Sequence, residues 1–149
     1  MKRVHIHAGV ADLDKAIAYY SALFGSEPVK VRSDYAKWAP EDLAINFAVS
    51  LSSSHSGISH LGIEYDTTDD VDAADQRVAS LGKVSHREEA VSCCYAKSDK
   101  AWVEDPGGTA WELFHTHGES DALVSSARVE TRPAESRLRS YSVSTGRGI

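Results

Sequence analysis

The sequence contains little cysteine, methionine or proline: two, one and four residues among 149. The two cysteines are adjacent, Cys93 and Cys94, so a framework of structural disulfides is excluded. No run of 18 apolar residues is present, which argues against a transmembrane helix. The segment from Met1 to His5 is polar and lacks the apolar stretch of a secretory signal. We therefore expect a cytoplasmic protein with no membrane partner.

The chain also lacks an excess of positive charge. Sixteen Lys and Arg residues stand against 22 Asp and Glu residues, which gives a formal net charge of -6. No basic face accumulates, so proteins that bind a phosphate backbone are disfavoured and we expect no nucleic-acid partner. Hydrophobic residues make up 42% of the chain, enough to bury a core. The length fits one domain or two small fused modules.

What is present is a repeated order of elements. Residues 4–10 alternate as a strand does, and Asp12 is placed to cap a helix over 13–24. After the polar segment 52–57, a second strand is predicted over 58–65 and a second helix over 70–81. Strand-like runs follow each helix, at 28–32, 35–38 and 43–51 in the first half and at 83–87, 91–97, 100–103 and 109–115 in the second.

This repetition predicts an α+β fold built from two βαβββ modules, 1–53 and 58–117, in one domain over 1–117. Two such modules side by side form a curved sheet with a cavity inside, where a metal site fits. Residues 118–149 are rich in Ser and Arg and poor in large apolar residues. We expect them to form a flexible extension, with a lid, a dimer contact or an ordered arm as alternatives.

Four polar positions align when the two modules are overlaid. His5 and His60 lie on the first strands, 55 residues apart, while Asn46 and Glu112 lie on the last strands. Two imidazoles and one carboxylate suit a divalent first-row metal, as in the facial triad of non-heme Fe(II) oxygenases, although Zn or Ni can occupy similar sites. Asn46 is a poor ligand. The alternative is that the histidines are half-exposed and Glu112 is a surface acid. A carboxylate among apolar neighbours, however, needs a partner.

The other polar residues near these positions have simpler interpretations. His7 lies on the same strand face as His5 and could replace or assist it. Four residues flank Cys93 and Cys94 and could contact a ligand that bears an oxyanion: Tyr95, Lys97, Lys100 and Trp102. Strand packing explains Trp102 at least as well, and solvation explains both lysines. The remaining histidines are expected to be solvated; they are His55, His86, His115 and His117.

The adjacent cysteines form a second candidate site. In a regular strand Cys93 and Cys94 would point to opposite faces, so joint binding of one ligand requires a bend or bulge in the backbone. A vicinal thiol pair binds soft centres such as trivalent arsenic or antimony, Cd(II) or Hg(II). The alternative is that both cysteines are buried as small hydrophobic residues.

Several of these segments resemble the motifs of a known protein family. Residues 4–25, with His5 seven positions before Asp12, resemble the vicinal oxygen chelate superfamily, which includes glyoxalases, fosfomycin-resistance proteins and extradiol dioxygenases. The segment Asp-Pro-Gly-Gly-Thr-Ala-Trp-Glu-Leu at 105–113 resembles its final hairpin. Within the superfamily, Ser-His-Leu-Gly at 59–62 and the Cys-Cys-Tyr-Ala segment at 93–96 resemble the ArsI/CadI group. The similarity covers about residues 1 to 117.

The resemblance implies that His5, His60 and Glu112 bind the metal and that Cys93 and Cys94 hold trivalent arsenic. The implied activity is that of an Fe(II)-dependent dioxygenase, with O₂ as co-substrate, which cleaves the C–As bond of trivalent organoarsenicals and so confers arsenic resistance. Ni, Zn or Co are other metals for this site. Alternatives are a protein that binds Cd(II) or Sb(III) without turnover, and another glyoxalase-superfamily metalloenzyme. The protein could be a monomer or a homodimer.

Overall fold

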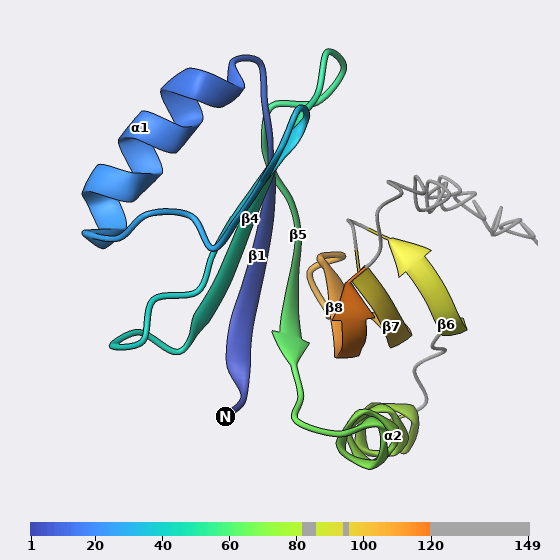
Figure 1. Ribbon diagram of the computed structural model, residues 1–149. Helices are drawn as coiled ribbons and strands as arrows, with labels where there is room; N and C mark the ends of the chain where they lie inside the picture. The colour runs from blue at the N-terminus through green and yellow to red at the C-terminus, as the bar shows by residue number, and fades with distance from the viewer. Residues whose placement is uncertain (82–85, 94–95, 120–149) are drawn as a thin grey trace, which may run out of the picture.

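The computed structural model describes residues 1–81, 86–93 and 96–119, which form two consecutive βαβββ modules (Figure 1). The elements of the first module are β1 (Arg3–Val10), α1 (Leu13–Phe24), β2 (Lys30–Arg32), β3 (Tyr35–Trp38) and β4 (Ile45–Leu51). Those of the second are β5 (Gly57–Glu64), α2 (Thr68–Ala79), β6 (His86–Cys93), β7 (Ala96–Glu104) and β8 (Ala110–Glu119). The predicted α+β class and the predicted repeat are confirmed.

The described strands form one eight-stranded sheet in the order β2-β3-β4-β1-β5-β8-β7-β6. Within each module the first strand pairs in parallel with the last, β1 with β4 and β5 with β8. The modules join where β1 and β5 pair antiparallel, and these two strands lie side by side at the centre of Figure 1. From each edge to the centre, the strands of a module follow the same order: second, third, fourth and first. This is the order expected for two modules related by a two-fold axis.

Each module has its own apolar core on the face of the sheet that its helix covers. In the first, Trp38 and Val49 are fully buried beneath α1, and in the second Val71 of α2 is fully buried against the sheet. Because side chains alternate along a strand, the residues between these apolar positions point to the opposite face. That face carries the polar residues of the candidate site.

The two helices begin at side-chain caps. As the sequence predicts, Asp12 caps α1, and its side chain accepts a hydrogen bond from the backbone N–H of Lys15. Gly25 ends the helix in the left-handed region. The predicted bounds of the second helix, 70–81, are wrong by two residues. Thr67, in extended backbone, caps α2 by accepting from the N–H of Asp70, so the helix begins at Thr68 and ends at Ala79.

The strand breaks predicted within the described residues 86–93 and 96–103 are also wrong, while positions 83–85 and 94–95 of the predicted runs lie outside the described residues. Instead of three short runs there are two strands, β6 and β7, which pair antiparallel with Cys93 opposite Ala96. The predicted runs at 83–87 and 91–97 left residues 88–90 outside any strand. In the structure they belong to the edge strand β6, where the register shifts between Glu88 and Val91, and an edge strand tolerates charge and irregular pairing.

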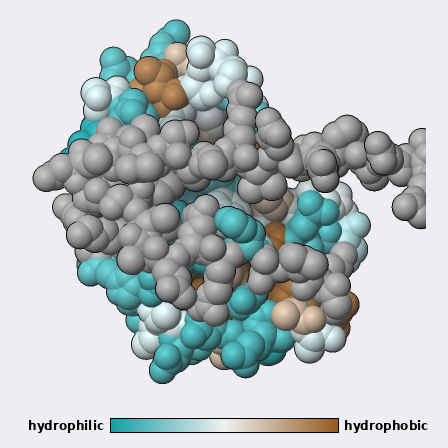
Figure 2. Space-filling view, turned by 90° about the vertical axis from the view of Figure 1, so that its right-hand side faces the viewer, coloured by the Kyte–Doolittle hydropathy of each residue, from teal (hydrophilic) through white to brown (hydrophobic). Residues whose placement is uncertain are grey.

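The last described strand, β8, continues to Glu119, two residues beyond the predicted end of the domain. The rest of the predicted extension, 120–149, lies outside the described residues. In the part of the chain that is described, neither helix is long and apolar enough to cross a membrane. In Figure 2 the described surface on the side of α2 and β6–β8 is mostly hydrophilic.

Candidate metal centre

The registers of the central strands bring the candidate ligands together. His5 of β1 lies opposite Asn46 of β4 on one side and Gly62 of β5 on the other, while Gly62 lies opposite Glu112 of β8. Gly62 therefore stands between His5 and Glu112. A Cβ atom at Gly62 would lie 2.5 Å from the carbonyl oxygen of Glu112, so only glycine permits this approach of β5 and β8. The missing side chain leaves room for the two ligands to face each other.

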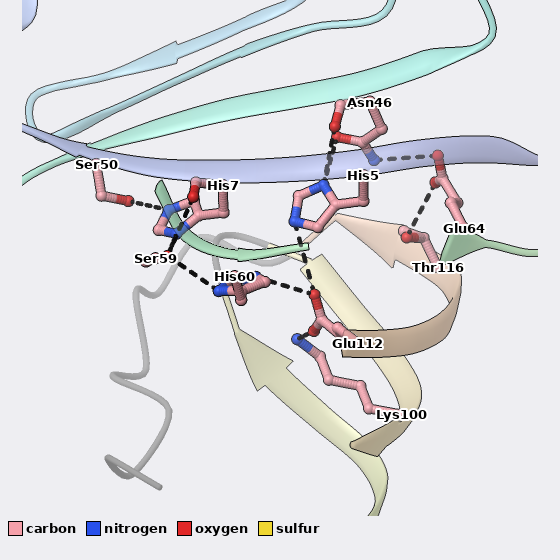
Figure 3. Close-up of polar contacts among 10 residues, drawn as sticks. All are labelled: His5, His7, Asn46, Ser50, Ser59, His60, Glu64, Lys100, Glu112 and Thr116. Carbon is pink, nitrogen blue, oxygen red and sulfur yellow. Dashed lines mark hydrogen bonds and ion pairs between the residues drawn. The ribbon is translucent and has the colours of Figure 1, made fainter. Parts of the chain in front are cut away.

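His5, His60 and Glu112 point toward one another on this face (Figure 3). The Oε2 atom of Glu112 lies 3.6 Å from Nε2 of His5 and 3.4 Å from Nε2 of His60. One ligand atom from each residue lies within 4.8 Å of the others. Adjacent ligands of a first-row metal, each bound at about 2.1 Å, lie roughly 3 Å apart. The three residues therefore suit one divalent ion in both donor type and spacing.

The second oxygen of Glu112 contacts Lys100. The Oε1 atom accepts a hydrogen bond from the Lys100 ammonium group, and both residues are buried. Burial alone would raise the pKa of Glu112. Its contact with His60 and the charge of Lys100 outweigh that effect and hold the pKa below its ordinary value. Glu112 is therefore an anion at neutral pH, and Oε2 is the oxygen left to face the histidines.

A hydrogen-bond chain orients His5. Its Nδ1–H donates to the backbone carbonyl of Asn46 at 2.9 Å, and the Asn46 side-chain oxygen lies 3.3 Å from the same nitrogen. The Asn46 amide group in turn donates to Glu64 at 3.0 Å. A carbonyl can only accept, so Nδ1 of His5 carries the proton and Nε2 has its lone pair available to a metal. Burial lowers the pKa of His5, which favours the neutral form.

His60 and His7 are linked through serine hydroxyls. Ser59 Oγ lies 3.0 Å from His60 Nδ1 and 2.7 Å from His7 Nδ1, and Ser50 Oγ lies 2.8 Å from His7 Nε2. Burial lowers the pKa of His7 to about 3. Both nitrogens of His7 thus contact hydroxyl groups, and His7 is not a member of the three-residue ligand set. On the other side, Trp102 of β7 packs edge-on against His60 at 5.1 Å between ring centroids.

The structure brings together some of the predicted residues and separates others. Asn46 does face the same site, as a hydrogen-bond partner of His5. Cys94 lies outside the described residues, and so does the side chain of Cys93, so the thiol pair stays a prediction. His55 and His86 are exposed as expected, whereas His115 is half-buried and contacts the carbonyl of Tyr65.

The contact of Lys100 with Glu112 is the feature of the site that the sequence interpretation did not predict. Solvation was weighed there against a role near a bound ligand, yet Lys100 is 6% exposed and contacts Glu112. The signal lies in the hairpin between β7 and β8: Glu104 pairs with Ala110, so Trp102 pairs with Glu112 and Lys100 with Phe114. Counting back from the predicted turn at 105–108 places Lys100 on the face of Glu112.

Both modules line the cavity beside these ligands. Its walls include Lys30, Tyr35 and Asn46 from the first module and Lys100 and Glu112 from the second. Because His5 also comes from the first module and His60 from the second, the site exists only where the two modules meet.

A family model described as the Glyoxalase/Bleomycin resistance protein/Dioxygenase superfamily matches residues 2–113. The chain belongs to this superfamily. Two solved structures share the fold of this chain. A Mn(II)-bound glyoxalase from Novosphingobium aromaticivorans is 24% identical, with a TM-score of 0.59 over 87% of this chain and 44% of that one. Homoprotocatechuate 2,3-dioxygenase from Arthrobacter globiformis is 18% identical, with a TM-score of 0.61 over 83% of this chain and 38% of that one.

Two relatives in sequence identify the group within the superfamily. A trivalent organoarsenical cleaving enzyme from Bacillus sp. (strain MD1) is 43% identical over 119 residues, covering 78% of this chain and 74% of the relative. The cadmium-induced protein CadI of Mycobacterium tuberculosis (strain ATCC 25618 / H37Rv) is 35% identical over 129 residues, covering 86% and 85%. The chain therefore belongs to the ArsI/CadI group of the glyoxalase superfamily, as its motifs predict.

Proposed function

We propose that this protein is a non-heme Fe(II)-dependent dioxygenase of the cytoplasm that cleaves the C–As bond of trivalent organoarsenicals and releases inorganic arsenite. The observation that carries the proposal is the convergence of His5, His60 and Glu112 in one cluster, in which His5 and Glu112 are buried and His60 is half-buried. This cluster lies in a chain 43% identical to a trivalent organoarsenical cleaving enzyme.

The three ligands determine what metal chemistry is accessible. His5, His60 and Glu112 would hold Fe(II) through Nε2, Nε2 and Oε2, and bound iron would supply the redox chemistry with dioxygen as co-substrate. Three protein ligands leave other positions of the metal open to small molecules. The same donor set accepts Ni, Zn or Co, so these ions are useful substitutes in binding experiments.

The chain's own residues prepare the site for this role. Lys100 contacts Oε1 of Glu112, which leaves Oε2 as the oxygen toward the histidines. Asn46 holds His5 with Nε2 turned to the same point. Burial of these residues excludes bulk water and strengthens each electrostatic contact.

We assign the binding of trivalent arsenic to Cys93 and Cys94, whose thiolates suit a soft centre. The backbone supports this assignment in one respect. Cys93 ends β6 opposite Ala96 of β7, and two residues further along β7 is Ser98, which lines the cavity beside Glu112. A ligand bound by this cysteine pair would be held on the same pair of strands that contributes Ser98 to the cavity, and holding a substrate near the reacting group lowers the entropic cost of reaction.

A second candidate function is binding of Cd(II) or Sb(III) without turnover. The 35% identity to the cadmium-induced protein CadI favours it. A third, another glyoxalase-superfamily metalloenzyme, has less support, because Asn46 stands where a fourth carboxylate ligand would be expected. The buried three-ligand site favours the enzyme, since a thiol-based binding protein has no use for a second site of hard ligands.

The test is anaerobic reconstitution with Fe(II), followed by a trivalent methyl- or phenyl-arsenical and air, with inorganic arsenite measured over time. We expect several turnovers that require both iron and O₂. Binding of one equivalent of arsenical without arsenite release would contradict the enzyme and favour the binding protein, and Cd(II) would then be titrated.

Two variants separate the roles of the two ligand sets. Glu112→Ala is expected to lose both bound iron and activity, because it removes the anionic ligand. The double variant Cys93→Ser/Cys94→Ser is expected to bind iron as wild type does and to lose arsenical binding. Iron content by elemental analysis and arsenical binding by calorimetry check each result. Full activity in the double variant would show that the thiols do not hold the substrate.

A further inference from the structure

The hydroxyl group of Ser59 in β5 has three partners at once (Figure 3). Its oxygen lies 3.2 Å from the backbone carbonyl oxygen of His7, 2.7 Å from Nδ1 of His7 and 3.0 Å from Nδ1 of His60. Ser59 is exposed, but it contacts the outer nitrogen of a half-buried metal-ligand candidate. This arrangement constrains where the protons of both rings lie.

The constraint follows from counting protons. A serine hydroxyl has one proton to donate and two lone pairs that accept. The carbonyl oxygen of His7 can only accept, so the hydroxyl proton of Ser59 must point to it if all three contacts are hydrogen bonds. Both Nδ1 atoms must then be N–H donors to Ser59. His60 consequently carries a proton on Nδ1, and Nε2 is the nitrogen that faces Glu112.

The hydrogen bond between His7 and Ser50 agrees with this assignment. With Nδ1 protonated, a neutral His7 has an unprotonated Nε2, which accepts from the hydroxyl of Ser50 at 2.8 Å. The His7 ring also stacks on the His60 ring, with 4.9 Å between centroids and 27° between planes. The His7 ring therefore packs on the His60 ring, while the backbone carbonyl of His7 accepts the hydrogen bond from Ser59.

We propose that Ser59 is a positioning residue that holds His60 in the tautomer with Nδ1 protonated, leaving Nε2 to bind the metal. His7 supplies the carbonyl oxygen and the stacked ring that make this possible. The backbone carbonyl of Asn46 performs the same task for His5. The inference rests on the metal-binding role proposed above, but its first test needs no metal.

The experiment uses the full-length metal-free protein with ¹⁵N-labelled histidine at neutral pH. Long-range ¹H–¹⁵N correlation spectra report which nitrogen of each ring is protonated. We expect Nδ1 of His60 to carry a proton in wild type. Ser59→Ala should populate a form of His60 that is protonated at Nε2 alone, whereas Ser59→Thr, which keeps the hydroxyl, should restore the wild-type spectrum. Ser54→Ala, at an exposed serine of the preceding loop, is the matched control and should change nothing.

Co(II) titration gives the second readout. Loss of an outer hydrogen bond to a metal-binding histidine costs about 10-fold or more in metal affinity. We expect the Co(II) dissociation constant to rise about 10-fold in Ser59→Ala and to stay near the wild-type value in Ser59→Thr and Ser54→Ala. His7→Phe keeps the carbonyl and an aromatic ring, so it should retain the Nδ1–H form of His60.

Two results would contradict the positioning role of Ser59. A wild-type His60 that is protonated at Nε2 alone would do so, and so would a Ser59→Ala variant with an unchanged protonation pattern of His60 and unchanged Co(II) affinity. If wild type failed to bind Co(II) while His60 showed the Nδ1–H form, the proposed function would fail and the positioning of His60 by Ser59 would stand.

Discussion

Glu112 shows how one side chain can serve two partners at the scale of a residue. Its Oε2 atom faces the two histidines, and its Oε1 atom contacts the Lys100 ammonium group. In the metal-free protein Lys100 is the positive charge that compensates the buried carboxylate. A divalent ion at the histidines would compensate it a second time. Metal binding and the Lys100 contact are therefore coupled through one carboxylate.

We expect Lys100→Met to destabilise the metal-free protein by about 3 kcal/mol, because removing one partner of a buried ion pair leaves the other charge unpaired. Saturating Co(II) should recover more unfolding free energy in this variant than in wild type, since the ion replaces the missing charge. Urea unfolding with and without Co(II) measures both quantities. Lys15→Met, at an exposed ion pair with Asp12, is the control and should change the unfolding free energy by less than about 1 kcal/mol. Equal stability of Lys100→Met and wild type would refute the compensating role.

Lys100 also shows which parts of a site a residue pattern cannot predict. The ligand set His5, His60 and Glu112 was predicted because each residue occupies a matching strand of a visible repeat. Lys100 has no such counterpart, and an isolated lysine is usually solvated. Only the register of the β7–β8 hairpin distinguishes it, since that register places it beside Phe114 on the buried side. Partners that lie across strands depend on registers, which a residue pattern alone does not fix.

At the scale of elements, the spacing of β5 and β8 depends on Gly62. We expect Gly62→Ala to cost about 1–3 kcal/mol of unfolding free energy, because a methyl group must separate two paired strands. Co(II) affinity should fall as well, since Glu112 moves with β8. Thermal unfolding and Co(II) titration check the two effects. Gly107→Ala, where a new Cβ would lie 3.2 Å from the tip of the Asp105 side chain, should be much milder. A variant at Gly62 with wild-type metal affinity would show that the strand spacing does not set the site.

The elements themselves were predicted unevenly. The order βαβββ, the first helix and its caps follow from local signals in the sequence, and each of these is confirmed. The second helix was misplaced because Thr67 is as good a cap as the acidic residues that follow it. The extent of β6 and β7 depends on pairing with β8 and with each other, and charged residues on an edge strand conceal it. Local chemistry specifies the helix ends, whereas tertiary pairing specifies the strand ends.

At the scale of the whole molecule, the three candidate metal ligands come from two modules that have separate cores. His5 comes from the first module, and His60 and Glu112 from the second. The modules are also linked by the antiparallel pairing of β1 and β5 and by side-chain hydrogen bonds, such as those of Asn46 with Glu64 and of His7 with Ser59. Bound metal would therefore act as a cross-link between modules as well as a cofactor.

Adding Co(II) at about 100 times its dissociation constant is expected to raise the unfolding free energy by about 2.7 kcal/mol, and a chelator should reverse the change. In hydrogen exchange, protection by metal should extend to β1 and β5 together. His5→Ala should abolish this gain in both modules, because one ligand is lost. His86→Ala, at an exposed histidine outside the ligand set, should keep it. Protection confined to β5 and β8 would contradict the cross-link.

The parallel pairing of β1 with β4 and of β5 with β8 has a consequence for protein synthesis. Each module begins with a strand whose partner in the same module is the last to be made, so on the ribosome β1 must wait for β4 and β5 must wait for β8. Glu112 is also the last of the three ligands to emerge. A nascent chain that ends before β8 therefore has both histidines but no carboxylate, and it acquires a complete site for a divalent ion only as its second module closes.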